Sequence, residues 1–220
     1  MESILAVVGF EIPAFSDHFV RFDSYGSLLR ADVIVATPYA PPIHDEQLQQ
    51  MVAMRKEITT ATAQGGLSVF FMSEYKPSYN LDPNLPNEDF LQWHNYCFLP
   101  IPAFRQQTGT DIQLAKSSLF IPFWKLMRPY FKYEVIFKNP FQKLLGINQK
   151  KDVIAGLSKY GKGHVLFLPS ITLICEQLYD DQNEEWRQTA LDLSVQMVSF
   201  LMQLASLLKE KDMEIFDAVA

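Results

Sequence analysis

Apolar residues in this chain fall into short continuous runs, and four of these runs predict buried β-strands. They span residues 4–10, 32–37, 67–72 and 164–168. A strand that is apolar at successive positions is buried on both faces of a sheet and is typical of α/β proteins. The pattern therefore predicts an α/β fold with these strands inside the sheet.

The last run belongs to a strand pair within residues 152–168. The tetrapeptide YGKG at 160–163 separates the two strands and predicts a tight turn. Because the second strand is apolar up to Pro169, the pair is expected in the middle of the sheet. A further strand is predicted at 133–137.

Helical spacing appears between the second and third apolar runs. Apolar residues recur at helical intervals over residues 46–64, and Gly65 and Gly66 end the pattern. Strand, helix and strand in succession form a β-α-β unit, whose two strands are parallel. Another helix is predicted from Asp111, broken near Pro122.

A long helix is predicted from residue 183 to residue 209, and it carries two apolar stripes. The stripe expected to cover the sheet consists of Trp186, Ala190, Leu193, Met197, Phe200, Leu204 and Leu207. The second stripe, more than about 90° around the helix, consists of Leu191, Val195, Val198, Met202 and Ala205. It needs a cover of its own, either a protein partner or residues 76–110 of the same chain. The predicted partner interface is Leu191, Val195, Val198 and Met202.

Residues 73–110 are predicted to form an insertion or lid. The span is rich in aromatic residues and contains Pro77, Pro83, Pro86, Pro100 and Pro102. A long insertion that leaves the carboxyl end of a strand is where α/β folds place binding loops. A lid with only a packing role fits the same composition, so both interpretations stay open.

Composition and charge fit one globular domain over residues 1–220. Hydrophobic residues make up 48% of the chain and charged residues 20%, which is ample for a core. The net charge of −6 opposes general nucleic-acid binding, because phosphate contacts need clustered Lys and Arg. Basic and aromatic residues interleave between 124 and 143. This favours a snorkelling rim on the surface, with a local phosphate-contacting platform as the alternative.

The compartment expected for this protein is the cytoplasm. Cys97 and Cys175 show no CxxC or metal-type spacing, which favours a reducing environment. The N-terminus lacks the basic region of a signal peptide. The longest apolar stretch, 197–208, is interrupted by Gln203 and is shorter than the roughly 20 residues that span a bilayer. No membrane association is therefore predicted.

No complete catalytic or nucleotide-binding motif is present. The tripeptide GKG at 161–163 precedes a strand, whereas a P-loop needs a helix N-terminus after its glycines. No metal or cofactor is predicted, because metal-type spacing is missing around His18, His44, His94 and His164. We interpret His164 as structural, since it begins a strand and so lies opposite the usual pocket.

Polar residues that follow the predicted strands should gather at one edge of the sheet. Candidates for chemistry at this edge are Glu11, His44, Ser73 and Glu74. Glu11 and Glu74 could serve as paired carboxylates in a hydrolase, although two solvated loop glutamates are the favoured interpretation. The same edge could instead bind a small ligand without chemistry, with the aromatic insertion as its lid.

The chain resembles the class I glutamine amidotransferase-like superfamily. The resemblance rests on DVIVATPYA at 32–40, LSVFFM at 67–72 and YGKGHVLFLPS at 160–170, and it covers most of residues 1–208. It implies a flavodoxin-like, three-layer α/β sandwich in which helices flank a mostly parallel central sheet. The Pro/aromatic-rich insertion and the long C-terminal helix would be added to that core.

Enzymes of this superfamily use a cysteine on a sharp elbow after a central strand, with a downstream His and Glu. Just past Met72 this chain has SEY at 73–75, and PSI at 169–171 stands where His and Glu would be. The resemblance therefore implies a degenerate, non-catalytic member that acts as a binding or assembly module, with a protein partner or as a homo-oligomer. It is compatible with a role in a bacterial multi-protein system, such as a defence system.

Overall fold

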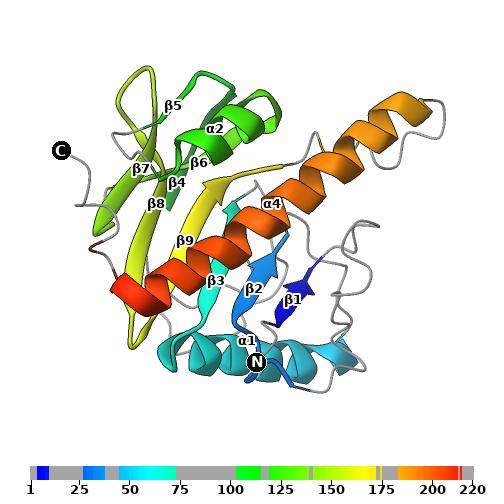
Figure 1. Cartoon of the computed structure of the whole chain (residues 1–220), viewed down its shortest axis with the longest axis vertical. Coiled ribbons are helices and arrows are strands. Elements are labelled where there is room, and N and C mark those ends of the chain that lie inside the picture. The colour runs from blue at the N-terminus through cyan, green and yellow to red at the C-terminus, as the bar shows by residue number, and fades with distance from the viewer. Residues whose placement is uncertain are drawn as a thin grey trace.

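The computed structural model describes residues 4–9, 27–37, 45–72, 103–114, 119–138, 141–171, 174, 183–212 and 214, with the backbone alone at 45–52 and 103–107. These ranges form a twisted sheet with helices packed against it (Figure 1). The strands are β1 (Leu5–Val8), β2 (Val33–Ala36), β3 (Leu67–Met72), β4 (Ala103–Gly109), β5 (Ile112–Leu114), β6 (Tyr133–Phe137), β7 (Lys143–Asn148), β8 (Val153–Tyr160) and β9 (Gly163–Pro169).

The sheet is mixed and has the strand order β1-β2-β3-β9-β8-β6-β4, with β7 beside β8 and β5 beside β7. Strands β1, β2, β3 and β9 pair in parallel. From β8 onward every pairing in the described residues is antiparallel. Because β6 and β7 are both antiparallel to β8, they point the same way as the parallel group, and most strands therefore share one direction.

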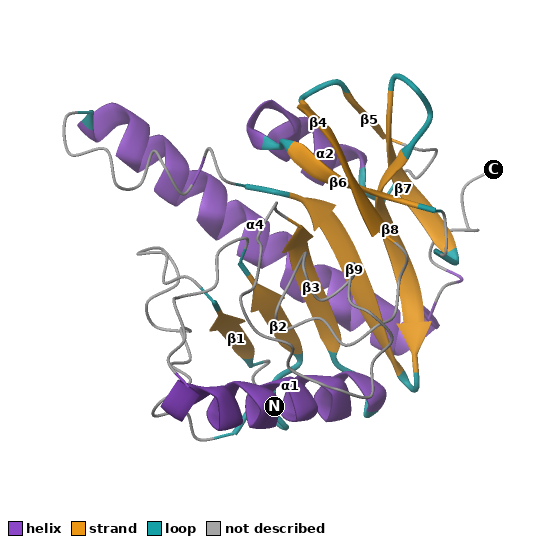
Figure 2. Ribbon diagram, turned by 180° about the vertical axis from the view of Figure 1, so that it is seen from behind, coloured by secondary structure: helices purple, strands orange, loops and turns teal. Residues whose placement is uncertain are grey.

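Helices pack against both faces of this sheet. They are α1 (Asp45–Ala63), α2 (Ile121–Met127), a short 3₁₀ turn (Arg128–Tyr130) and α4 (Glu184–Lys211). Helix α1 connects β2 to β3, which are parallel neighbours, so the predicted β-α-β unit is confirmed. Seen from behind, α1 lies on the near side of the sheet and α4 crosses its far side (Figure 2).

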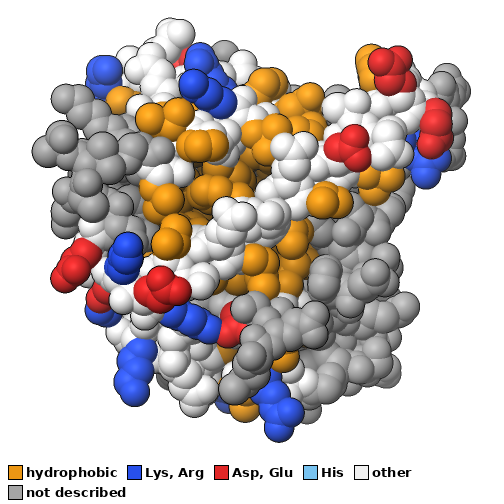
Figure 3. Space-filling view, viewed as in Figure 1, with side chains coloured by type: hydrophobic (Ala, Val, Ile, Leu, Met, Phe, Trp, Pro, Cys, Tyr) orange, Lys and Arg blue, Asp and Glu red, His pale blue; other side chains and the backbone are white. Residues whose placement is uncertain are grey.

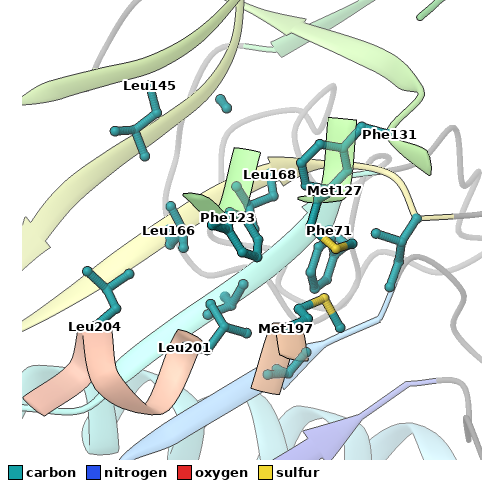
Figure 4. Close-up of a cluster of buried hydrophobic side chains, with 14 of the residues drawn as sticks. Phe71, Phe123, Met127, Phe131, Leu145, Leu166, Leu168, Met197, Leu201 and Leu204 are labelled. Atoms are coloured by element: carbon teal, nitrogen blue, oxygen red, sulfur yellow. The ribbon is translucent and has the colours of Figure 1, made fainter. Parts of the chain in front are cut away.

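Two hydrophobic cores result from the alternation of side chains along each strand. Val33 and Val35 point toward α4, whereas Ile34 points toward α1. The core under α4 and α2 is the larger and includes Phe71, Phe123, Leu166, Met197, Leu201 and Leu204 (Figure 4). The core under α1 includes Met54, Ile58, Ala61, Phe70 and Phe167. Both faces of the central strands are therefore buried, as their uninterrupted apolar runs predict.

The β8–β9 hairpin interlocks with the end of α1. Its two-residue turn has φ +60° at Gly161, a value that glycine adopts at little cost. The Lys162 N–H donates to Ala63 O (2.9 Å), and the His164 N–H donates to Gly66 O (3.0 Å). The turn backbone thus satisfies a carbonyl at the helix C-terminus, and the GKG tripeptide has a structural role there.

Most predicted elements are confirmed, and one is wrong. The strand at 133–137, the pair within 152–168 and the long final helix all form. The helix predicted from Asp111 does not, because Ile112–Leu114 is strand β5 and pairs with β7. Pro122 begins α2 rather than breaking a helix, since proline is compatible with the first helical turn.

Helix α4 is rotated relative to the predicted sheet-facing stripe. Four residues of that stripe, Ala190, Leu193, Met197 and Leu204, are buried as predicted. Phe200 instead packs sideways against α2, where its ring stacks on Phe123 with centroids 4.4 Å apart. The residues that complete the buried face are Ser194, Leu201 and Leu208, together with Ala205, which the sequence pattern assigned to the second stripe.

Candidate functional site

The carboxyl ends of the parallel strands carry polar groups that are tied into the fold. Thr37 follows β2, is fully buried, and donates its hydroxyl to Val8 O (3.3 Å). Ser170 follows β9 and exchanges backbone hydrogen bonds with Lys132 at 3.0 and 3.1 Å. Both residues therefore link neighbouring segments of the sheet.

The predicted catalytic candidates lie outside the described residues. These are Glu11, His44, Ser73 and Glu74. Of the predicted insertion, residues 73–102 also lie outside, whereas 103–109 form β4 and join the sheet. The hydrolase and ligand-binding alternatives therefore stay predictions from the sequence.

A cluster of charged groups fixes the C-terminal end of α4 to the β8–β9 hairpin. Asp212 caps the helix, and its Oδ1 lies 2.8 Å from Nε2 of His164 on β9. The other carboxylate oxygen, Oδ2, accepts from the Lys159 ammonium on β8. Within the described residues, no hydroxyl or thiol forms a hydrogen bond with His164, whose ring contacts Asp212. The cluster lies at the end of the sheet opposite the usual pocket, as predicted for His164.

Burial and hydrogen bonding lower the pKa values of two groups in this cluster, His164 and Asp212. Burial lowers the pKa of His164, and the hydrogen bond with Asp212 offsets part of that effect. Hydrogen bonds from Lys159 and His164 lower the pKa of Asp212 below its usual value. The folded protein therefore favours a neutral His164 beside an ionised Asp212.

The lowered pKa of His164 predicts a loss of stability on mild acidification. An unfolded histidine takes up its proton near pH 6.5, before the folded one does, so the unfolded state gains relative stability as pH falls. Urea unfolding at about pH 7.5 and about pH 5.5 measures this difference. The free energy of unfolding should change less between the two pH values in His164→Gln than in the wild type, because the variant lacks His164. The other three histidines are common to both proteins and cancel in the comparison. Equal pH effects in the two proteins would contradict this role of His164.

A hollow of about 490 Å³ lies beside this cluster. It is lined by charged residues of both signs, among them Arg30, Asp32, Lys162, Lys209 and Asp212. Lys209 on α4 forms an ion pair with Asp32, whose Oδ2 also accepts from the Ile4 N–H (2.8 Å). Partial burial would raise the pKa of Asp32, but the hydrogen bonds from Lys209 and Ile4 outweigh it and lower that pKa. These pairs connect α4 to the N-terminal strands.

A second polar cluster joins β5, β6 and the β7–β8 turn. The Tyr133 hydroxyl donates to Asp111 Oδ1 (2.7 Å), and the Gln149 N–H donates to Asp111 Oδ2 (2.9 Å). The hydrogen bonds from Gln149 and Tyr133 lower the pKa of Asp111. Asp111 thus stabilises this edge of the sheet as an anion.

Three of the four aromatic residues that interleave with basic residues between positions 124 and 133 are buried in the fold. Trp124, Phe131 and Tyr133 are all buried in the core under α2 and α4. Stacking of nucleic-acid bases requires exposed ring faces. These three rings therefore serve packing, Tyr130 is half-buried against the same core, and the alternative of a local phosphate-contacting site stays a prediction.

The remaining candidate is one side of α4, called here the α4 apolar face and defined as Leu191, Val195, Val198 and Met202. Val195 is 60% exposed, and the other three are half-buried against the core beneath the helix. Apolar side chains are visible on both sides of the helix in the space-filling view (Figure 3). Helix α4 therefore packs on the sheet with one side and exposes apolar surface, above all Val195, on the α4 apolar face.

The first turns of α4 project beyond the sheet (Figure 1). Trp186 lies on this projecting part and is 53% exposed, although the sequence pattern assigns it to the sheet-facing stripe. Its position is explained by the length of the helix, which has 28 residues and extends past the strands it crosses. The pattern predicts the direction of a side chain but not where the sheet ends.

Helix α4 is also long and apolar enough to cross a membrane by length and composition, and 39% of its most apolar window is buried inside the fold. Core helices of globular proteins pass the same test of length and composition when they are mostly buried. Among the described residues, no group of three or more His, Cys, Asp or Glu could hold a metal ion.

The chain matches no protein-family model and no curated protein. Among solved structures, the exo-beta-1,4-mannosidase Op5Man5 from Opitutaceae bacterium strain TAV5 is similar over 83% of this chain, with 14% identity and a TM-score of 0.41. This chain spans 28% of the length of that protein. A similarity at this level carries no argument about function, so the candidate site stands on its own geometry.

Proposed function

We propose that this chain is a non-catalytic α/β binding module that contacts another protein through the α4 apolar face. The sheet then serves as a scaffold that holds α4 in place. In this proposal the complete chain adopts the three-layer, amidotransferase-like sandwich that its sequence resembles, and it works in the cytoplasm as part of a larger assembly.

The observation that carries the proposal is the exposure of Val195 in the middle of a docked helix. A single exposed aliphatic residue is ordinary on a protein surface. Here Val195 belongs to a row of four apolar residues spaced three or four apart, which places them side by side along the helix. Such a row is the usual form of a helix surface that packs against another protein.

The charged groups of the described residues support a scaffold role rather than catalysis. His164 and Lys159 both bind Asp212, and Lys209 binds Asp32. Each of these contacts joins α4 to a strand or to a residue beside a strand. Their evident effect is therefore to fix the helix that carries the α4 apolar face.

Site-specific photo-crosslinking tests the proposal. A benzophenone side chain replaces Val195 in cells that express the chain natively, and adducts are identified by mass spectrometry. We expect a defined protein adduct from position 195, because a benzophenone reacts with groups that lie against it.

The matched control places the same group at Lys56, which is exposed on α1. The proposal predicts that the adduct seen from position 195 is missing from position 56. An identical set of adducts from the two positions, or no adduct from position 195, would overturn it.

A further inference from the structure

The α4 apolar face is flanked by opposite charges in a palindromic arrangement. Glu184 precedes the face by seven residues and Lys209 follows it by seven. The successive spacings from Glu184 through the four apolar residues to Lys209 are 7, 4, 3, 4 and 7. At about 100° per residue all six side chains fall within a sector of about 60°. One continuous face of α4 therefore has the same order of charged and apolar positions from either end. The charges at its two ends are opposite.

This symmetry is what an antiparallel pair of identical helices requires. A two-fold axis midway between Val195 and Val198 sets Val195 of one copy against Val198 of the other, and Leu191 against Met202. The same axis sets Glu184 of each copy against Lys209 of the other. A two-fold interface uses the same patch on both subunits, and the row of apolar residues provides such a self-complementary patch.

The end charges are available for these contacts. The side chain of Glu184 is 82% exposed and pairs with Arg187 one turn along α4 (3.3 Å), and that of Lys209 is 45% exposed. A carboxylate has two oxygens and can accept from a second cation. Lys209 already binds Asp32, but an ammonium group has three donors and can bind a second carboxylate. A parallel pair would instead place Glu184 against Glu184 and Lys209 against Lys209. Charge complementarity therefore selects the antiparallel arrangement.

We propose that the partner of the α4 apolar face is a second copy of this chain, with the two α4 helices antiparallel and a Glu184–Lys209 ion pair at each end. This inference rests on the proposed function and adds the identity and orientation of the partner. The scaffold of each copy then lies on the outer side of the helix pair.

Charge-reversal variants test the inference. Sedimentation velocity at low salt measures how strongly each variant associates with itself. The purified wild type is expected to associate with rising concentration. Glu184→Lys and Lys209→Glu should each weaken self-association about tenfold, because each variant places like charges at both ends of the pair. Mixing the two variants should restore association, since the two reversed charges then meet each other at one end of the pair and the two unchanged charges meet at the other.

Matched controls carry the same charge changes on other sides of the helix. Glu185 and Lys211 are exposed in the same turns, but at 100° per residue they lie at least about 80° away from the face. Glu185→Lys and Lys211→Glu should leave association within about twofold of the wild type. Because Lys209→Glu also removes the contact with Asp32, thermal unfolding of each variant confirms that it is folded.

Three results would overturn the inference. The first is a wild type whose mass stays at 25.3 kDa at every concentration. The second is an equal effect of Glu184→Lys and Glu185→Lys on self-association. The third is a mixture of Glu184→Lys and Lys209→Glu that associates no better than either variant alone. A monomeric wild type together with a defined crosslink from position 195 to a different protein would overturn self-pairing alone. The proposed function would stand in that case.

Discussion

Leu201→Ala should lower the free energy of unfolding by about 3 to 4 kcal/mol. Leu201 is fully buried and lies in the core between α4 and the sheet (Figure 4). Truncation removes apolar contacts and leaves a cavity that the surrounding strands, hydrogen-bonded on both sides, fill only in part. Urea unfolding followed by circular dichroism measures the change.

Gln203→Ala is the matched control for Leu201→Ala. Gln203 lies two residues further along the same helix and is exposed, so its truncation should change stability by less than about 0.5 kcal/mol. The contrast between the two variants measures how firmly α4 is docked. Equal, small effects would show that α4 does not pack on the sheet as described, and the scaffold role would fail with it.

Gly163→Ala should cost about 3 kcal/mol of stability. A Cβ atom at position 163 would overlap the carbonyl oxygens of Thr62 and Gly66. Neither oxygen can move easily, because Gly66 O accepts from the His164 N–H (3.0 Å) and Thr62 lies near the end of α1. The expected result is a lower urea midpoint from loss of the contact between the hairpin and α1.

Lys162→Ala separates this steric effect from any role of the lysine side chain. Lys162 is exposed in the same turn, and its structural contribution is the backbone hydrogen bond to Ala63 O (2.9 Å). Alanine keeps that bond, so the change should stay within about 0.5 kcal/mol. A large loss in Lys162→Ala and none in Gly163→Ala would contradict the structural interpretation of the GKG tripeptide.

The central strands could be predicted because their burial leaves a strong sequence signal. The runs at 32–37, 67–72 and 164–168 are apolar on successive positions, and in the structure each is buried on both faces. Helix α1 was predictable because Gly65 and Gly66 end its pattern. These elements depend on local composition, which a single sequence records.

The antiparallel half of the sheet was harder to predict, because its strands are defined by distant pairing. Strand β5 has three residues with mixed burial, which is too short for a period to show. It forms because β7, more than 25 residues later, offers an edge to pair with. Pro122 gave a misleading signal, since proline both ends helices and begins them.

The polar contacts at the end of α4 could not be predicted, because they join residues far apart in the sequence. His164 and Asp212 are 48 residues apart, and Lys209 and Asp32 are 177 apart. The residues of the α4 apolar face could be predicted, because the four apolar positions follow helical spacing. Its partial burial depends on the core beneath the helix, which the sequence does not record.

A crosslinking scan around α4 tests directly whether the α4 apolar face contacts another protein. The benzophenone group is placed in turn at Leu191, Val195, Val198 and Met202, and at the exposed positions Gln196 and Gln203. We expect adduct yields that rise and fall with the helical repeat, high at the four face positions and low at the two glutamines. Equal yields all around the helix, or a maximum at the glutamines, would contradict the claim that this face contacts a protein.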